Sequence, residues 1–214
     1  ALICSVCLFF SGRKEGLFID EVYTYGLSNS YYAPFVDDLK DDDMIDKVIT
    51  RQELLDYLTV DDSDKFSAGS VYYNQSQDVH PPLYYWLFNF ASSLNCGNFS
   101  LWTGLVLDLV IYLLTLAALY LLALKLFESP DSAAAAVLLY GLSSVGLSTM
   151  IMIRMYVLLT LETVLLAYFI ACLMRGGRTW HYPAVAVTVF AGMMTQYYYV
   201  FYAFFVCLAF DVYL

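Results

Sequence analysis

Two adjacent carboxylates, Asp20 and Glu21, lie in the stretch FIDEVYTYG, directly after an apolar segment. A carboxylate at a membrane edge has the chemistry of a general base, and two together have that of a divalent metal site. The alternative is an ordinary interfacial acid pair that marks a helix end. The pair is therefore a candidate base and a candidate metal site.

Arg154 is embedded in the apolar stretch STMIMIRMYVLLTL. An arginine in such surroundings is costly, and it is a functional candidate by default. It could pair with Asp20 or Glu21, or bind a phosphate group through two parallel hydrogen bonds. The alternative is an arginine that extends to the membrane surface at a helix boundary.

His80 precedes two prolines in DVHPPLYYWLF. A histidine there has the chemistry to donate to a phosphate or to transfer a proton. Asp78, two residues earlier, could orient the ring or cap the following helix. The alternative is a residue that only marks the helix entry.

Three further polar features belong to the apolar half of the chain. Asp108 and Glu162 lie inside apolar runs, where they could line a polar cavity or pair with a partner, and we do not expect direct catalysis from either. The cluster QYYYVFY at 196–202 has the rings of an aromatic belt, with sugar stacking or lipid contact as the alternative.

Composition places these residues in a membrane protein. The chain is 61% hydrophobic, whereas soluble domains average about 45–50% apolar. The excess lies in long runs, which predicts an all-α, polytopic transmembrane helix bundle. Because the sequence begins and ends inside apolar runs, we expect an N-terminal fragment of a longer protein with its C-terminal part missing.

The net charge of -10 is concentrated between Glu15 and Asp78. An acidic segment argues against binding to nucleic acid and against docking on anionic lipid head groups. The stretches DDLKDDD and DDSD are interpreted as solvated loop, since a calcium site would need the Gly and Glu spacing that they lack.

Five scattered cysteines do not form a disulfide framework. Cys4 and Cys7 make a CxxC without a nearby histidine or second CxxC. We therefore interpret Cys4 and Cys7 as packing residues.

The pattern along the chain predicts a long polar insertion between membrane segments. Residues 1–10 are the expected end of a first span, and 11–100 an extracytoplasmic loop with interfacial helices at about 51–58 and 81–95. Thr50 and Glu53 have the spacing of a capping box for the first of these helices. Within 101–214, spans are expected at about 101–127, 133–152, 155–175, 181–196 and 198–214.

Basic residues predict the orientation. Lys125, Arg175, Arg178 and His181 occupy two connectors on one side, and such residues favour the cytoplasm. Segment 81–95 is shorter than the about 20 residues of a span, so it and the loop should lie outside. Its prolines suit a first helical turn, and its interfacial anchors would be Tyr84, Tyr85, Trp86 and Phe88.

Taken in order, FIDEVYTYG, the ELLDYL helix, DVHPPLYYWLF and IRMYVLL resemble the polytopic glycosyltransferases of the GT-C fold that use lipid-phosphate sugars. These include the protein O-mannosyltransferases and the aminoarabinose transferase of lipid A, and the likeness is greatest to bacterial members with an RgtA/B/C/D-like domain. QYYYVFYAFF is a looser match, with Gln196 where many relatives have histidine.

The resemblance implies an inverting sugar transfer at the outer membrane face. Asp20 would be the base that deprotonates the acceptor, with Glu21 supporting it or a divalent metal, the only cofactor left open. Arg154 and His80 would bind the donor phosphate. Residues expected to line the site are Tyr156, Asp78, Gln196 and Tyr197.

The implied partners are a polyprenyl- or dolichyl-phosphate sugar, a protein, lipid or glycan acceptor, and membrane lipids. The implied location is a bacterial plasma membrane with the active site outside.

Two alternatives remain at this point. A transporter or lipid flippase would use Asp108, Arg154 and Glu162 to line a pathway, but it would favour broken, repeated helices near the midplane. The sequence has no internal repeat, and its strongest polar motifs cluster at the outer edge. A catalytically inactive scaffold of the same fold is the other alternative.

Overall fold

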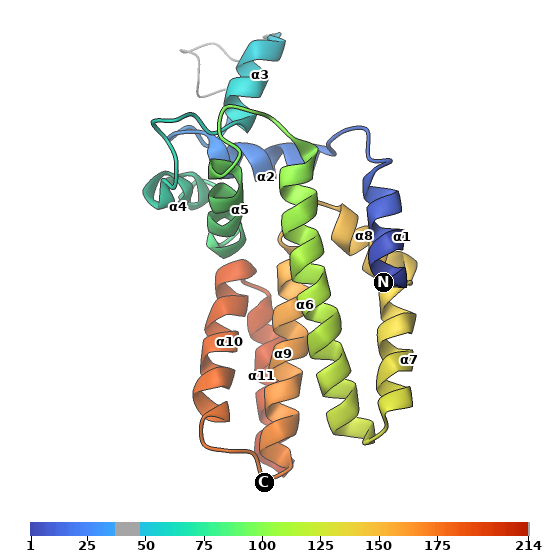
Figure 1. The fold of residues 1–214 in the computed structure, drawn as a ribbon. Helices are drawn as coiled ribbons and strands as arrows, with labels where there is room; N and C mark the ends of the chain where they lie inside the picture. Colours follow the sequence, from blue (N-terminus) through green and yellow to red (C-terminus); the bar gives the residue numbers. More distant parts are fainter. Residues whose placement is uncertain (37–47, 214) are drawn as a thin grey trace. The chain divides into compact units, whose positions relative to one another are not determined.

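The computed structural model describes residues 1–36 and 48–213, so the acidic stretch DDLKDDD lies outside the described residues. Within these ranges the regular structure is entirely helical, as predicted. The helices are α1 Leu2–Ser11, α2 Ile19–Asn29, α3 Arg51–Leu58, α4 Ala68–Ser76, α5 Leu83–Ser93, α6 Leu101–Phe127, α7 Pro130–Gly141, α8 Ser144–Ile151, α9 Tyr156–Met174, α10 His181–Thr195 and α11 Tyr199–Tyr213 (Figure 1).

The chain divides into two compact units. We call residues 1–14 and 108–214 the membrane unit, and residues 15–107 the loop unit. Helix α6 begins in the loop unit and continues into the membrane unit.

Two helices of the described chain, α6 and α9, are long and apolar enough to cross a membrane. A third span results if α7 and α8, which meet at an angle of 59°, are counted as one broken segment. Helices α1 and α11 are apolar but shorter, and α10 has 15 residues. The chain is therefore an integral membrane protein.

The segment 133–152, expected as one span, is broken between Gly141 and Ser144. Ser143 caps α8 by accepting a hydrogen bond from the Gly146 N–H at 3.0 Å. A serine that caps a helix start gives the backbone an alternative to continuing the preceding helix. This local competition accounts for a break inside an apolar run.

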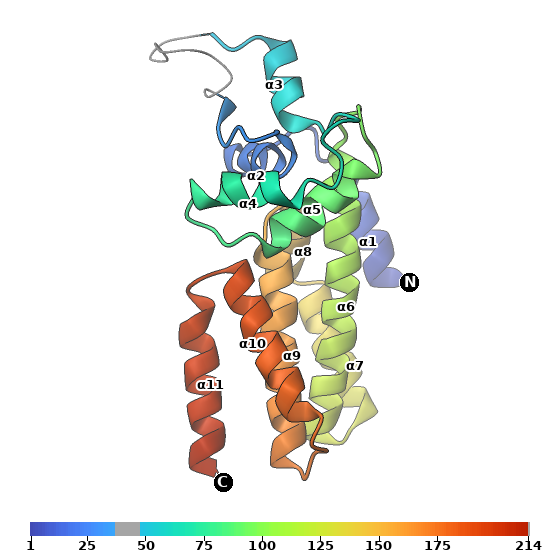
Figure 2. The same ribbon diagram turned by 90° about the vertical axis from the view of Figure 1, so that its left-hand side faces the viewer.

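Helices α9, α10 and α11 pack together in the membrane unit and lie side by side in both ribbon views (Figures 1 and 2). Their core is formed by Leu166, Ile170, Tyr199 and Ala203. A Cβ added to Gly192 of α10 would lie 2.2 Å from the Tyr199 ring, so glycine permits this close approach.

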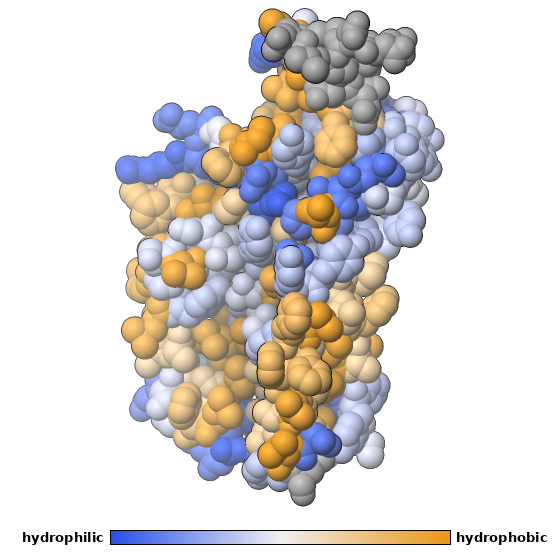
Figure 3. All heavy atoms as spheres, turned by 180° about the vertical axis from the view of Figure 1, so that it is seen from behind, coloured by the Kyte–Doolittle hydropathy of each residue, from blue (hydrophilic) through white to orange (hydrophobic). Residues whose placement is uncertain are grey.

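The surface of the membrane unit is largely apolar. Hydrophobic side chains dominate the lower half of Figure 3, and hydrophilic side chains appear again toward the bottom of the picture. Much of this surface comes from α11, where Phe201, Phe204, Phe205 and Val212 are exposed. An exposed apolar surface of this extent suits contact with lipid.

The loop unit is built around α2, which packs against α3, α4 and α5. Tyr57 of α3 is buried against Gly26 of α2, where an added Cβ would lie 1.9 Å from the ring, and its hydroxyl donates to the Pro34 carbonyl at 2.8 Å. The predicted capping box of α3 is confirmed, because Thr50 and Glu53 exchange side-chain and backbone hydrogen bonds.

Helix α5 corrects the expected set of interfacial anchors. Tyr84, Tyr85 and Phe88 are fully buried, so their assignment as lipid-facing anchors was wrong; Phe88, for example, packs edge-on against Tyr25. The apolar side chains that α5 and its C-terminal end expose are Leu87, Phe90 and Leu94, which are spaced for one helix face. Helix α5 begins after Pro82, which is its N-cap.

All five cysteines are free. Cys7 and Cys172 are buried in the membrane unit. In the loop unit burial raises the pKa of the Cys96 thiol, whose sulfur lies 3.1 Å from the Val60 carbonyl oxygen. A thiol held neutral in this way is a poor nucleophile.

Candidate functional site

Asp20 and Glu21 lie in the first turn of α2, a separate helix, rather than at the end of the first apolar helix. Negative side chains are favoured at that position by the helix dipole. Glu21 is fully buried, and its carboxylate accepts a hydrogen bond from the Phe18 N–H at 2.6 Å, which closes the helix start. Asp20 is only half-buried. The two acids therefore differ: Glu21 has a structural bond, and Asp20 is the more accessible carboxylate.

Asp78 and His80 form a contact pair ahead of α5. A carboxylate oxygen of Asp78 lies 2.9 Å from His80 Nδ1, and both side chains are half-buried. This contact is the geometry that orienting the ring would require of Asp78. With Nδ1 facing the carboxylate, Nε2 is the ring nitrogen left for another group.

Arg154 lies in the short break between α8 and α9, where its backbone N–H donates to the Met152 carbonyl at 2.7 Å. The side chain is 5% exposed, and its neighbours Ile153 and Met155 are fully buried. A largely buried arginine does not fit the alternative of an arginine extended into water. Tyr156 begins α9 and is 39% exposed.

Gln196 and Tyr197 occupy the corner between α10 and α11. The Gln196 N–H donates to the Gly192 carbonyl. The Tyr197 side chain is exposed, which is compatible with a place in an aromatic belt at the membrane surface or with contact to a ligand.

Glu162 of α9 holds this corner, because its carboxylate accepts a hydrogen bond from the Thr195 hydroxyl at 2.9 Å. The Tyr199 hydroxyl donates to the Glu162 backbone carbonyl at 3.0 Å.

Thr195 was not recognised from sequence, and Tyr199, expected as part of an aromatic belt or a ligand contact, is instead buried. Thr195 is a polar residue at the end of an apolar run, directly before QYYY, and that position was the available signal. Asp108, the other acid predicted inside a span, is fully buried in the membrane unit.

The eight predicted site residues fall into two sets. Asp20, Glu21, Asp78 and His80 belong to the loop unit, where Asp78 and His80 touch. Arg154, Tyr156, Gln196 and Tyr197 belong to the membrane unit. Their union in one site is a proposal.

No group of three or more His, Cys, Asp or Glu side chains suited to a metal ion occurs among the described residues. Asp20 and Glu21 are the pair left open as ligands, and Glu21 already accepts from Phe18.

A comparison with family models decides the class of this protein. The model of dolichyl-phosphate-mannose-protein mannosyltransferases matches residues 79–214, which is more than half of the chain. The chain belongs to this family. It is a membrane glycosyltransferase of the GT-C type, similar to mannosyltransferases.

The family match includes His80, Arg154, Tyr156, Gln196 and Tyr197, and it begins after Asp78. It favours the enzyme over the transporter or flippase, for which no separate support was found. No curated protein and no solved structure matches the chain.

The hydrogen bond from Thr195 to the Glu162 carboxylate should contribute to the stability of the folded protein. Thr195→Val should destabilise the protein by about 1–3 kcal/mol, because it removes the donor to a buried carboxylate oxygen. Thermal unfolding in detergent would measure the change. The matched control is Thr188→Val in the same helix, where the buried hydroxyl donates only to the Ala184 carbonyl. Equal shifts for both variants would contradict the role of Thr195.

Proposed function

We propose that the protein transfers a sugar from a polyprenyl- or dolichyl-phosphate donor to an acceptor at the outer membrane face. The observation that carries the proposal is the family match over 79–214. The family's description names dolichyl-phosphate-mannose and protein. Mannose is therefore the first sugar to test, and a protein is the first acceptor, with lipid and glycan acceptors next.

Asp20 is the proposed general base. Its half-buried carboxylate at the start of α2 would take the proton of the acceptor hydroxyl. The acceptor oxygen then bonds to the anomeric carbon, and the bond from that carbon to the donor phosphate oxygen breaks. The lipid phosphate leaves with the electron pair, and displacement from the opposite face inverts the anomeric configuration.

Glu21 is proposed to support the base. Its bond to the Phe18 N–H fixes the first turn of α2, which carries Asp20. If the reaction uses a divalent metal, the two carboxylates are the groups that would hold it.

Arg154 and His80 are proposed to bind the donor phosphate. Negative charge grows on that phosphate as it leaves, so fixed donors assist its departure. Arg154 is largely buried at a helix break, where its guanidinium could make charge-assisted hydrogen bonds to the phosphate. As an imidazolium, His80 would donate from one nitrogen to Asp78 and from the other to the phosphate. Tyr156, Gln196 and Tyr197 would line the site.

Asp20→Asn should lower sugar transfer by about 10²-fold or more, because the amide cannot accept the acceptor's proton. The measurement is transfer from a polyprenyl-phosphate sugar by the full-length protein in proteoliposomes. Asp61→Asn, at an exposed aspartate of the loop unit, is the matched control and should retain full activity. Normal transfer by a folded Asp20→Asn protein would exclude Asp20 as the base.

Arg154→Ala should lower kcat/KM for the donor by about 10²-fold, through a higher KM, a lower kcat or both, since it removes a charge-assisted contact with the phosphate. Arg154→Lys should recover only part of this loss, because lysine lacks the planar fork. Arg13→Ala, at an exposed arginine of the same unit, is the control. Unchanged donor kinetics in the Arg154→Ala protein would remove Arg154 from the phosphate site.

The outward orientation rests on the basic connectors and can be tested by labelling. In a full-length chain without its native cysteines, a cysteine at the exposed Ser76 should react with an impermeant thiol reagent added to intact cells. A cysteine at the exposed Thr179 should react only after the membrane is opened. The reverse pattern would invert the proposed topology.

A further inference from the structure

The membrane unit has a cationic pocket at the connector between α9 and α10. Its volume is about 320 Å³, and its polar lining includes Lys125, Arg175, Arg178 and His181. Lys125 comes from α6, whereas the others lie at the end of α9, in the connector and at the start of α10. Two stretches of the chain that are far apart in sequence thus contribute basic residues to one pocket.

Two of these cations have no acidic partner within the part of the chain that the structure describes. Arg175 pairs with Glu128 and also donates to the Leu126 carbonyl at 3.0 Å. Lys125 is half-buried and Arg178 is exposed, and neither forms an ion pair with a described residue. The pocket therefore retains a net positive charge after the Glu128 pair is counted.

The aromatic side of the pocket is rigidly arranged. The Trp180 and His181 rings stack with centroids 4.0 Å apart, and Trp180 meets Phe169 edge-on. His181 Nδ1 lies 2.8 Å from the Arg178 carbonyl oxygen, which fixes the connector. A tryptophan of this kind is typical of the headgroup level of a bilayer.

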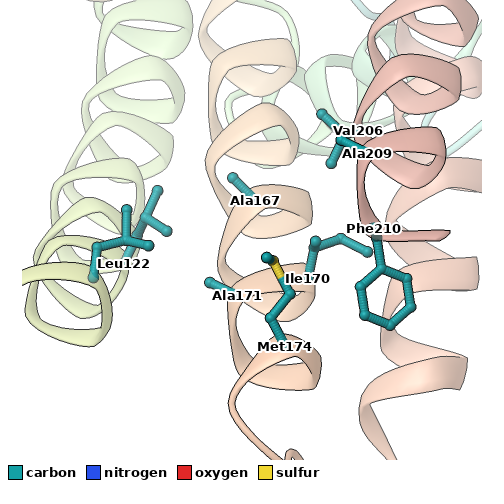
Figure 4. Close-up of a pocket in the computed structure, with 9 residues that line it drawn as sticks. Leu122, Ala167, Ile170, Ala171, Met174, Val206, Ala209 and Phe210 are labelled. Carbon is teal, nitrogen blue, oxygen red and sulfur yellow. The ribbon is translucent and has the colours of Figure 1, made fainter. Parts of the chain in front are cut away.

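An apolar groove of about 270 Å³ occupies the same stretch of helices (Figure 4). It is lined from α6, α9 and α11, among others by Leu122, Ala171, Met174 and Phe210. Leu126 and Ala171 of the groove are sequence neighbours of Lys125 and Cys172 of the pocket. A charged pocket and an apolar groove thus share the same ends of α6 and α9.

We propose that an anionic phospholipid binds here, with its headgroup phosphate in the cationic pocket and an acyl chain in the groove. Charge selects an anionic headgroup, because Lys125 and Arg178 would gain the partner that the described chain does not supply. The groove at the same ends of α6 and α9 favours a lipid over a free phosphate, which would use only the pocket. This proposal does not depend on the transferase activity.

The test uses the full-length protein in detergent, titrated with equimolar phosphatidylglycerol and phosphatidylcholine and observed by native mass spectrometry. Phosphatidylglycerol should be retained preferentially. Lys125→Gln and Arg178→Gln should each weaken its binding by about five-fold, the effect expected for one cation near a lipid surface. Arg51→Gln, on the exposed start of α3, is the charge-matched control and should have no effect.

A second variant tests the groove. Ala209→Phe adds bulk at an exposed position that lines it, and should weaken phosphatidylglycerol while thermal unfolding stays unchanged. Millimolar glycerol phosphate, which has the headgroup but no chain, should not displace the lipid. Displacement by glycerol phosphate together with no effect of Ala209→Phe would mean a free-phosphate site and overturn the proposal. Equal retention of both lipids would also overturn it.

Discussion

A bilayer offers no hydrogen-bond partners, so every backbone group freed inside it must be satisfied by the protein itself. The membrane unit shows how this constraint is met where its helices end. At the α7–α8 break, the Tyr112 hydroxyl donates to the Gly141 carbonyl at 3.1 Å and the Ser143 hydroxyl to the Tyr140 carbonyl at 2.8 Å. Each interruption of an apolar helix is thus accompanied by a polar side chain, which makes such side chains structural as well as candidates for chemistry.

The same constraint explains the second break and the α10–α11 corner. Arg154 lies where α8 has ended and α9 has not begun, and its own N–H is satisfied by Met152. At the corner, Thr195 and Tyr199 donate to the side chain and backbone of Glu162. A polar residue in a span can therefore serve packing alone, and Glu162 is better explained by its two donors than by a transport pathway.

The sequence predicted the features that depend on local pattern. Helices α6 and α9 follow from long apolar runs, and the α3 capping box follows from Thr50 and Glu53. It did not predict α2 or α4, whose sequences mix polar and apolar residues. It also misassigned Tyr84 and Tyr85, since an aromatic residue beside a membrane and one inside a small core look alike without knowledge of the packing partner.

In the candidate site, too, the sequence predicts what depends on local pattern and not what depends on packing. Asp20 and Glu21 are recognisable as a pair because they are adjacent, and Asp78 and His80 because they are two residues apart. Which acid is accessible depends on how the Phe18–Glu21 turn closes, and only the structure distinguishes them. The Thr195–Glu162 contact joins residues 33 positions apart, on two helices whose relative rotation no local pattern specifies.

The two proposed phosphate sites of the membrane unit lie at opposite ends of α9. Arg154 precedes the helix and Arg175 follows it, and 19 residues at 1.5 Å each span about 28 Å. That length is close to the about 30 Å thickness of a bilayer's hydrocarbon core, so a lipid at Lys125 and Arg178 cannot compete directly with a donor phosphate at Arg154. Any effect of that lipid on transfer would have to be transmitted through the helices that join the two ends, which include α6 and α9. The Glu162–Thr195 contact joins α9 to α10 between these two ends and holds the corner that carries Gln196.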